Sequence, residues 1–314
     1  GVLLCAPAGN DLLYSHDLSK QGRNFANKVW NALRLVDGWE IDESLNQSEL
    51  KPAIHWFEAK LRAAIEKVNN AYSKYRLSEA AMEIYKLIWD DFCSWYLEMI
   101  KPGFEQPISR EIYDATMNFF DELMVLLHPM MPFITEEVWQ NVKERKEGES
   151  IMVAPWPKSE GKDADLIAFG EKMQGLVSGI RNLRSQQGIS PKDSVEVFIS
   201  SEEKGYETYK GLISKLANVS KLEYTKNSIP NAKSFIIGTD EIFVPVEIDA
   251  EKEKEEMQKE LDRQKGFLKG VEKKLSNERF VNNAPDAVVA SEKKKQADAL
   301  ARIEILEKSL AELS

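Results

Sequence analysis

The chain has 314 residues, of which 43% are hydrophobic and 30% are charged, with a net charge of −10. At about 150 residues per domain this is two domains' worth of chain, with enough apolar material for a sizeable core. Only 16 residues are glycine and 12 are proline, so we expect few turns and mainly helix. Collagen, a disordered chain and a disulfide scaffold are excluded. No apolar run approaches the ~18 residues of a membrane span, so we expect a cytoplasmic protein without membrane contact.

The chain begins Gly1-Val2-Leu3-Leu4, an apolar segment with no initiator methionine, cap or turn before it. We interpret it as a piece of a longer protein. The two cysteines, Cys5 and Cys93, lie far apart, and there are only three histidines. We therefore expect neither a metal site nor a catalytic triad.

The first 147 residues predict an antiparallel bundle of helices. Apolar residues recur at steps of three and four over 17–38, and again from Ile54 to Tyr75. Ser78 is the expected N-cap of a third helix that stops at Pro102, and a fourth covers 109–128. A fifth is expected to begin at Thr135. Long helices with short connections favour antiparallel neighbours.

Residues 148–248 predict a small α+β module. We expect strands at 150–153, 195–199, 221–224, 234–237 and 242–248, with helices at 165–187 and 206–217.

Residues 249–314 predict an antiparallel coiled-coil hairpin that projects as an arm. One heptad seam runs from Met257 to Leu275 and a second from Val289 to Leu313, and Asn282-Asn283-Ala284-Pro285 separates them. Nine basic and four acidic residues lie between Arg263 and Lys295, a local charge of +5. Such a surface can attract phosphate. An ordinary solvated coiled-coil surface explains the charges equally well.

Residues 23–34 place amide, cationic and aromatic groups on one helix. These groups can hydrogen-bond to and stack on unpaired bases, the usual mode of sequence-specific RNA recognition. Phe25 and Trp30 taken alone are more typical of a core, and Cys93 is expected to be a small buried hydrophobe. Gly161-Lys162 is followed by Asp163, so the chain has no phosphate-binding glycine loop of the Walker type. We find no catalytic constellation.

Six motifs together resemble the C-terminal part of bacterial valyl-tRNA synthetases. They occur in order along the whole chain: Ala8-Gly9-Asn10-Asp11, Arg23-Asn-Phe-Ala-Asn-Lys28, Trp30-Asn-Ala32, Asp91-Phe-Cys-Ser-Trp-Tyr-Leu-Glu98, Leu127-His-Pro-Met-Met-Pro-Phe-Ile-Thr-Glu136 and Asn277-Glu-Arg-Phe-Val-Asn-Asn-Ala-Pro285. The 127–136 motif is shared with isoleucyl and leucyl relatives, whereas the 277–285 motif indicates the valyl family. An isoleucyl relative would end in a zinc-binding cysteine cluster, and no cysteine follows Cys93.

The resemblance implies a parent enzyme that joins valine to tRNA(Val) with ATP and Mg²⁺ and hydrolyses threonyl-tRNA. Its catalytic and editing domains would lie upstream in the same chain. Residues 1–16 would be the end of the catalytic domain, 17–147 the class I anticodon-binding bundle, 148–248 a connector and 249–314 the tRNA-binding arm. This piece would hold no catalytic residue, metal or cofactor, would be inactive alone and would be a monomer.

The resemblance also assigns site residues. The residues expected on the anticodon side are Asn27, Lys28, Asn31, Arg34, Leu35 and Leu97. Where an aromatic is expected the chain has Leu35, so we expect an apolar pocket from Leu35 and Leu97 with Lys28 on a phosphate. The backbone contacts expected on the arm are Arg263, Lys269, Lys273, Arg279, Lys293 and Lys294.

A second hypothesis is a helical scaffold whose coiled coil pairs with another protein. Gln264 and Gln296 lie within the seams, and polar seam residues specify register and partner number. A chain that is dimeric and does not bind RNA would favour this second hypothesis.

Overall fold

A computed structural model describes residues 16–161, 163–246 and 250–276, and within 292–303 residues 292, 293, 295–297, 299, 300 and 303. Contacts divide the chain into two compact units, 1–245 and 246–314. The expected end of the catalytic domain, up to residue 15, lies outside the described residues.

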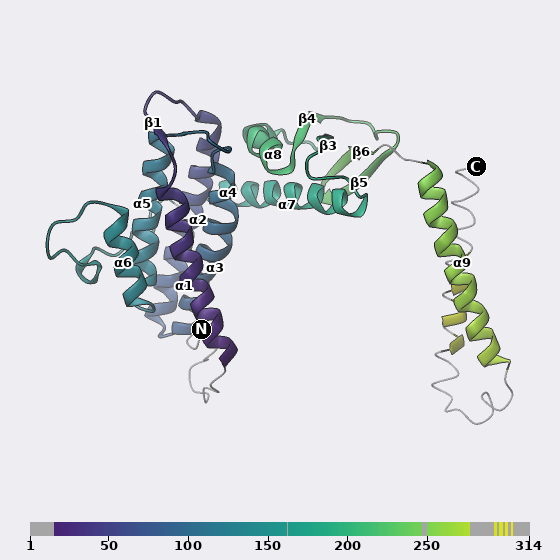
Figure 1. The fold of residues 1–314 in the computed structure, drawn as a ribbon, viewed down its shortest axis with the longest axis horizontal. Helices are drawn as coiled ribbons and strands as arrows, with labels where there is room; N and C mark the ends of the chain where they lie inside the picture. Colours follow the sequence, from purple (N-terminus) through teal and green to yellow (C-terminus); the bar gives the residue numbers. More distant parts are fainter. Residues whose placement is uncertain are drawn as a thin grey trace. The chain divides into compact units, whose positions relative to one another are not determined.

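The first part of the larger unit is a group of helices that run side by side (Figure 1). They are α1 (His16–Asp37), α2 (Lys51–Ser73), α3 (Leu77–Lys86), the π-helical segment η3 (Leu87–Tyr96), α4 (Leu97–Ile100), α5 (Arg110–Leu127) and α6 (Pro132–Val142). A 3₁₀ turn, η2 (Ser48–Leu50), precedes α2, and two short parallel strands, β1 (Ile41–Asp42) and β2 (Ile108–Ser109), pair beside the bundle.

Two predicted helix starts are wrong. The N-cap of α3 is Arg76, not Ser78, and no side chain caps that helix. Helix α6 begins at Pro132, before Thr135, because proline has no N–H to leave unpaired in the first turn. Thr135 instead lies one turn into α6, where its hydroxyl donates to the Met131 carbonyl at 2.9 Å.

Aromatic side chains fill the centre of the bundle. Phe57 of α2 lies 5.1 Å from Phe92 and 4.9 Å from Phe119 between ring centroids. The buried Tyr96 and Thr116 hydroxyls share a 2.9 Å hydrogen bond, so the polar end of Tyr96 has a partner inside the core. The helical spacing of these residues is what turns them to one face.

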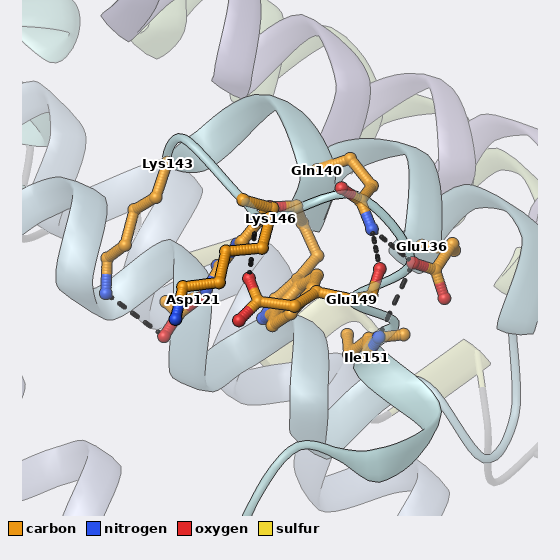
Figure 2. Close-up of polar contacts among 9 residues, drawn as sticks. Asp121, Glu136, Gln140, Lys143, Lys146, Glu149 and Ile151 are labelled. Atoms are coloured by element: carbon orange, nitrogen blue, oxygen red, sulfur yellow. Dashed lines mark hydrogen bonds and ion pairs between the residues drawn. The ribbon is translucent and has the colours of Figure 1, made fainter.

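The segment after α6 is held by charged groups rather than by strand pairing. Asp121 of α5 forms an ion pair with Lys143 at 3.2 Å (Figure 2). It forms another with Arg145. The Glu136 carboxylate accepts hydrogen bonds from the Ser150 hydroxyl at 2.7 Å and from the Ile151 N–H at 3.4 Å.

The predicted strand at 150–153 is therefore wrong. Residues Ile151–Val153 form a 3₁₀ turn, η4, and the Ser150 hydroxyl accepts a hydrogen bond from the Met152 N–H at 3.2 Å. Ser150 caps this turn, and Glu136 binds the Ile151 N–H that a strand would use in a ladder.

The rest of the larger unit is the predicted α+β module. It consists of α7 (Ala164–Gln186), β3 (Val195–Ser200), the 3₁₀ turn η5 (Gly205–Tyr209), α8 (Lys210–Ala217), β4 (Val219–Tyr224), β5 (Ala232–Ile237) and β6 (Asp240–Pro245). The sheet order is β4-β3-β6-β5; β3 and β4 are parallel, and the other pairs are antiparallel. Helix α7 runs along the sheet, and α8 lies beside β4 (Figure 1).

The module is joined to the bundle by close contacts. A Cβ placed on Gly170 of α7 would lie 2.0 Å from Cδ1 of the fully buried Trp56 of α2, so the two helices meet where only glycine fits. From α8, the Lys215 ammonium donates to the carbonyls of Met99, at 2.9 Å, and Lys101, at 2.5 Å.

The smaller unit contains α9 (Ala250–Leu275). From position 261 to 275, the side chains that are buried or half-buried are those of Leu261, Gln264, Leu268, Val271 and Leu275. They repeat at steps of three and four, the spacing of the predicted seam. The ammonium of Lys274 lies 3.6 Å from the carboxylate of Glu292. This ion pair joins α9 to the described residues within 292–303, which we call the return segment. The predicted Asn/Pro turn lies outside the described residues.

Among the residues that the structure describes, no helix is long and apolar enough to cross a membrane.

Candidate nucleic-acid interface

A groove of about 540 Å³ lies between α1 and the continuous helix formed by η3 and α4. Its lining residues are Asn24, Asn27, Lys28, Asn31, Ala32, Leu35, Trp89, Cys93 and Leu97.

The sequence of α1 explains one wall. Phe25, Val29 and Leu33 recur every four residues and are buried in the bundle, which leaves the neighbouring stripe for polar side chains. Asn27 and Asn31 lie on that stripe and are exposed. Each amide offers both donors and an acceptor, so this wall can hydrogen-bond to a ligand edge.

Lys28 carries the positive charge of the groove. Its ammonium lies 3.2 Å from the Ser94 hydroxyl and 4.4 Å from the centroid of the Trp89 ring. Cation–π attraction and the hydrogen bond both favour this position. The charge is therefore held at the groove instead of moving freely in solvent.

The opposite wall comes from η3 and the first residue of α4. Trp89, Cys93 and Leu97 are spaced by four residues and face the groove together. The Ser94 hydroxyl donates to the carbonyl of Trp89, five residues earlier, at 2.8 Å. π-Helical turns occur frequently at functional sites.

Cys93 belongs to the apolar floor. Burial raises the pKa of its thiol to about 12, so the thiol is neutral at physiological pH and is a poor nucleophile. Together with Ala32, Leu35 and Leu97 it gives the groove an apolar base beneath the polar rim of α1.

Most of the predicted anticodon-side residues meet at this groove. Asn27, Lys28, Asn31, Leu35 and Leu97 line it. Arg34 is exposed on α1 and is not among the lining residues.

Trp89 was not among the predicted site residues. The signal that could have found it is its position one turn before Cys93, on the same face. Ser94, which contacts Lys28, was missed as well.

A second cavity, of about 650 Å³, lies beside the ends of α7 and α8 and includes Arg181, Arg184 and Lys215. These cations already have partners. Arg184 is buried and donates to the carbonyls of Ala217, at 2.8 Å, Ser190 and Asp193. We assign this cavity a structural role, because its cations satisfy backbone carbonyls.

On the arm, Arg263, Lys269, Lys273 and Lys293 are exposed. Arg279 and Lys294 lie outside the residues whose side chains the structure describes. Glu292 is buried between Lys274 and Lys295, and the hydrogen bond from Lys295 lowers the pKa of its carboxyl.

Within the described ranges, no group of three or more His, Cys, Asp or Glu side chains is placed to hold a metal ion.

Comparison with known proteins identifies the two parts of the chain. Residues 55–199 match the family described as the anticodon-binding domain of tRNA ligases, and residues 249–314 match the valyl-tRNA synthetase tRNA-binding arm. The first match begins within α2 of the bundle and ends within β3 of the α+β module, one residue before the end of that strand.

Curated relatives match along the whole length. A valine-tRNA ligase of Christiangramia forsetii is 48% identical over 100% of this chain, and one of Parabacteroides distasonis is 47% identical over 100%. One of Bacillus subtilis is 33% identical over 97%. The chain spans 36% of the length of each of these relatives.

The two matches thus define a part of a tRNA ligase that carries an anticodon-binding domain and a tRNA-binding arm. The chain belongs to the valyl-tRNA synthetase family, as the C-terminal region that carries its anticodon-binding domain and arm. The relatives favour this interpretation over the protein-binding scaffold.

Proposed function

We propose that this chain binds tRNA(Val), with the groove between α1 and η3–α4 on the anticodon and the arm on the outer corner of the tRNA. The observation that carries the proposal is the composition of the groove. It combines an amide rim, an apolar floor and one cation held in place by Trp89 and Ser94.

Each part of the groove suits an unpaired nucleotide. Asn27 and Asn31 can pair with base edges, and the floor formed by Leu35 and Leu97 can receive the apolar face of a base. The Lys28 ammonium can bind the phosphate beside it. Arg34, exposed on the same helix, would add a backbone contact outside the groove.

The arm would supply affinity without reading sequence. The exposed cations of α9 and the return segment, together with Arg279 and Lys294, would neutralise phosphates and release counterions. We propose that the two segments form an antiparallel coiled-coil hairpin. The Lys274–Glu292 ion pair supports this pairing, and so do the buried and half-buried side chains that recur at steps of three and four along α9.

The catalytic steps would belong to the rest of the polypeptide. The full protein would ligate valine to tRNA(Val) using ATP and Mg²⁺ bound by an upstream catalytic domain, and an upstream editing domain would hydrolyse threonyl-tRNA. This chain would act as a monomer and would hold no cofactor itself. Residues 17–147 would form the anticodon-binding domain and 148–248 a connector.

A matched pair of substitutions on α1 tests the groove. Asn31→Ala removes one amide of the rim, whereas Gln21→Ala removes an exposed amide from the same helix outside the groove. With a valine tRNA transcript, Asn31→Ala should weaken binding by about fivefold or more, the cost of one base contact. Gln21→Ala should leave the affinity unchanged. Equal affinity of both variants and the unmodified chain would contradict the groove as the binding site.

A further inference from the structure

The loop that follows α4 presents an exposed aromatic side chain. Leu97 lines the groove, α4 ends at Ile100, and Phe104 follows within the same turn region. Phe104 is 89% exposed. A single exposed apolar side chain needs no explanation by itself. A function for Phe104 therefore depends on where this loop lies and on which contacts hold it.

The loop connects the segments that follow the two walls of the groove. Leu35 and Leu97 are the groove residues nearest the ends of α1 and α4. The segments that follow these two helices are joined, because the Ile108 N–H donates to the Glu40 carbonyl at 2.8 Å and β1 pairs with β2. The loop therefore leaves one wall of the groove and returns to the segment that continues the other wall.

The loop is also held at both ends and turned in the middle. The Lys215 ammonium of α8 donates to the carbonyls of Met99 and Lys101, at 2.9 and 2.5 Å. At the other end, the Ser109 N–H donates to the Gln47 side chain at 2.9 Å. Glu105, directly after Phe104, has a φ of +55°, a left-handed conformation that other contacts must support.

The groove lacks an open aromatic surface at this end. Leu35 is aliphatic, and at the other end the Trp89 ring already packs against Tyr85, 5.6 Å away and nearly parallel, and against Lys28. Unpaired bases bind readily to aromatic faces because every base has a π-face. Phe104 offers such a face in the loop that connects the segments following the two walls of the groove.

We propose that Phe104 stacks on an unpaired base of the RNA bound in the groove, and that Lys215 is a positioning residue that holds the Phe104 loop from the α+β module. This inference rests on the proposed function. It gives the module a role in RNA recognition, because its helix α8 fixes the loop that completes the site.

The test compares two phenylalanines of equal exposure. Phe104 is 89% exposed, and Phe133 on α6 is 91% exposed and is not a lining residue of the groove. With the valine tRNA transcript, Phe104→Ala should weaken binding roughly 5- to 100-fold, the range for the loss of one base–aromatic stack. Phe133→Ala should bind like the unmodified chain. Neither variant should lower the melting temperature, because neither side chain is buried.

Two further substitutions of Phe104 distinguish base stacking from a general hydrophobic contact. Phe104→Trp should retain the affinity, since a larger aromatic ring stacks at least as well. Phe104→Leu should lose affinity almost as Phe104→Ala does. Full affinity in the leucine variant would contradict stacking.

A double-mutant cycle tests the role of Lys215. Lys215→Met keeps the apolar stem but removes the ammonium, so it should weaken RNA binding when Phe104 is present and have no further effect in the Phe104→Ala background. Lys210→Met, an exposed position on the same helix, is the control and should change neither. An additive loss in the double variant would contradict a positioning role.

The outcomes distinguish the two levels of the proposal. If Asn31→Ala weakens binding but Phe104→Ala behaves like Phe133→Ala, the stacking inference is wrong and the groove stands. If neither Asn31→Ala nor Phe104→Ala changes the affinity, the proposed function of the groove is itself wrong.

Discussion

The ammonium of Lys28 lies 4.4 Å from the centroid of the Trp89 ring and 3.2 Å from the Ser94 hydroxyl. Both partners belong to η3, whereas Lys28 belongs to α1, so the contact joins the two walls of the groove. It fixes one positive charge beside an amide rim and an apolar floor. That combination is what makes the groove suited to a nucleotide rather than to an apolar ligand.

Removing this charge should weaken RNA binding in a salt-dependent way. Lys28→Met should lower the affinity for the valine tRNA and reduce the slope of log K against log salt concentration by about 1, as for the loss of one phosphate contact. Lys20→Met, also on α1 but paired on the surface with Asp17, is the control. An unchanged slope for Lys28→Met would show that Lys28 contacts no phosphate.

The buried thiol predicts a loss of stability at alkaline pH. Burial raises the pKa of Cys93 from 9.0 to about 12, so above pH 9 the unfolded chain releases this proton while the folded chain retains it. The unfolded state then binds fewer protons, and the contribution of Cys93 to stability falls as pH rises from 9 towards 12.

Unfolding by urea at pH 8 and pH 10 measures this effect. Between these values Cys93 should cost the folded state about 1 kcal/mol. The Cys93→Ala variant should therefore lose less stability between the two pH values than the unmodified chain does. An equal loss in both proteins would contradict the raised pKa.

Two glycines of α7 should respond oppositely to alanine. A Cβ on Gly170 would lie 2.0 Å from the buried Trp56 ring, whereas one on Gly175 would lie 3.4 Å from Ile237, an ordinary contact. Gly170→Ala should destabilise the chain by roughly 1–3 kcal/mol through overpacking. Gly175→Ala should stabilise it by about 0.5–1 kcal/mol through helix propensity. Urea unfolding checks both; a stabilising Gly170→Ala would contradict the close approach of α7 to α2.

The buried guanidinium of Arg184 predicts a structural effect without an effect on RNA specificity. Arg184→Met would leave the carbonyls of Ser190, Asp193 and Ala217 without their shared donor. We expect a loss of about 2 kcal/mol or more in the free energy of unfolding. The Arg181 side chain donates to the single carbonyl of Leu216 among the described residues, so Arg181→Met should cost less. At a temperature where both variants are folded, discrimination between tRNA anticodons should be unchanged.

The sequence predicted the helices and the α+β strands because their burial follows simple periods. Phe25, Val29 and Leu33 repeat at the helical step, and Val195, Val197 and Ile199 alternate as a half-buried strand does. The same periodicity places five of the six residues predicted for the anticodon side along one groove, on the two helices that the resemblance had selected; their role on the anticodon stays a prediction.

The wrong strand lies where a side chain from another helix decides the backbone. Residues 150–153 have the composition of a strand, but the Glu136 carboxylate and the Ser150 hydroxyl turn them into η4. The π-helical form of η3 has no periodic signal of its own, so the position of Trp89 one turn before Cys93 was the only hint in the sequence of its place in the groove. The role of Lys215 depends on a contact more than 110 residues away in the chain.

The most direct test of the account is a titration of the chain with a valine tRNA transcript and with the same transcript carrying a changed middle anticodon base, at low and near-physiological salt. We expect the changed base to weaken binding by more than about 1 kcal/mol at both salt concentrations, the cost of one lost base contact. Equal binding of the two transcripts, with an affinity that disappears as salt rises, would show that only the basic arm is engaged and would contradict the reading of the anticodon by the groove.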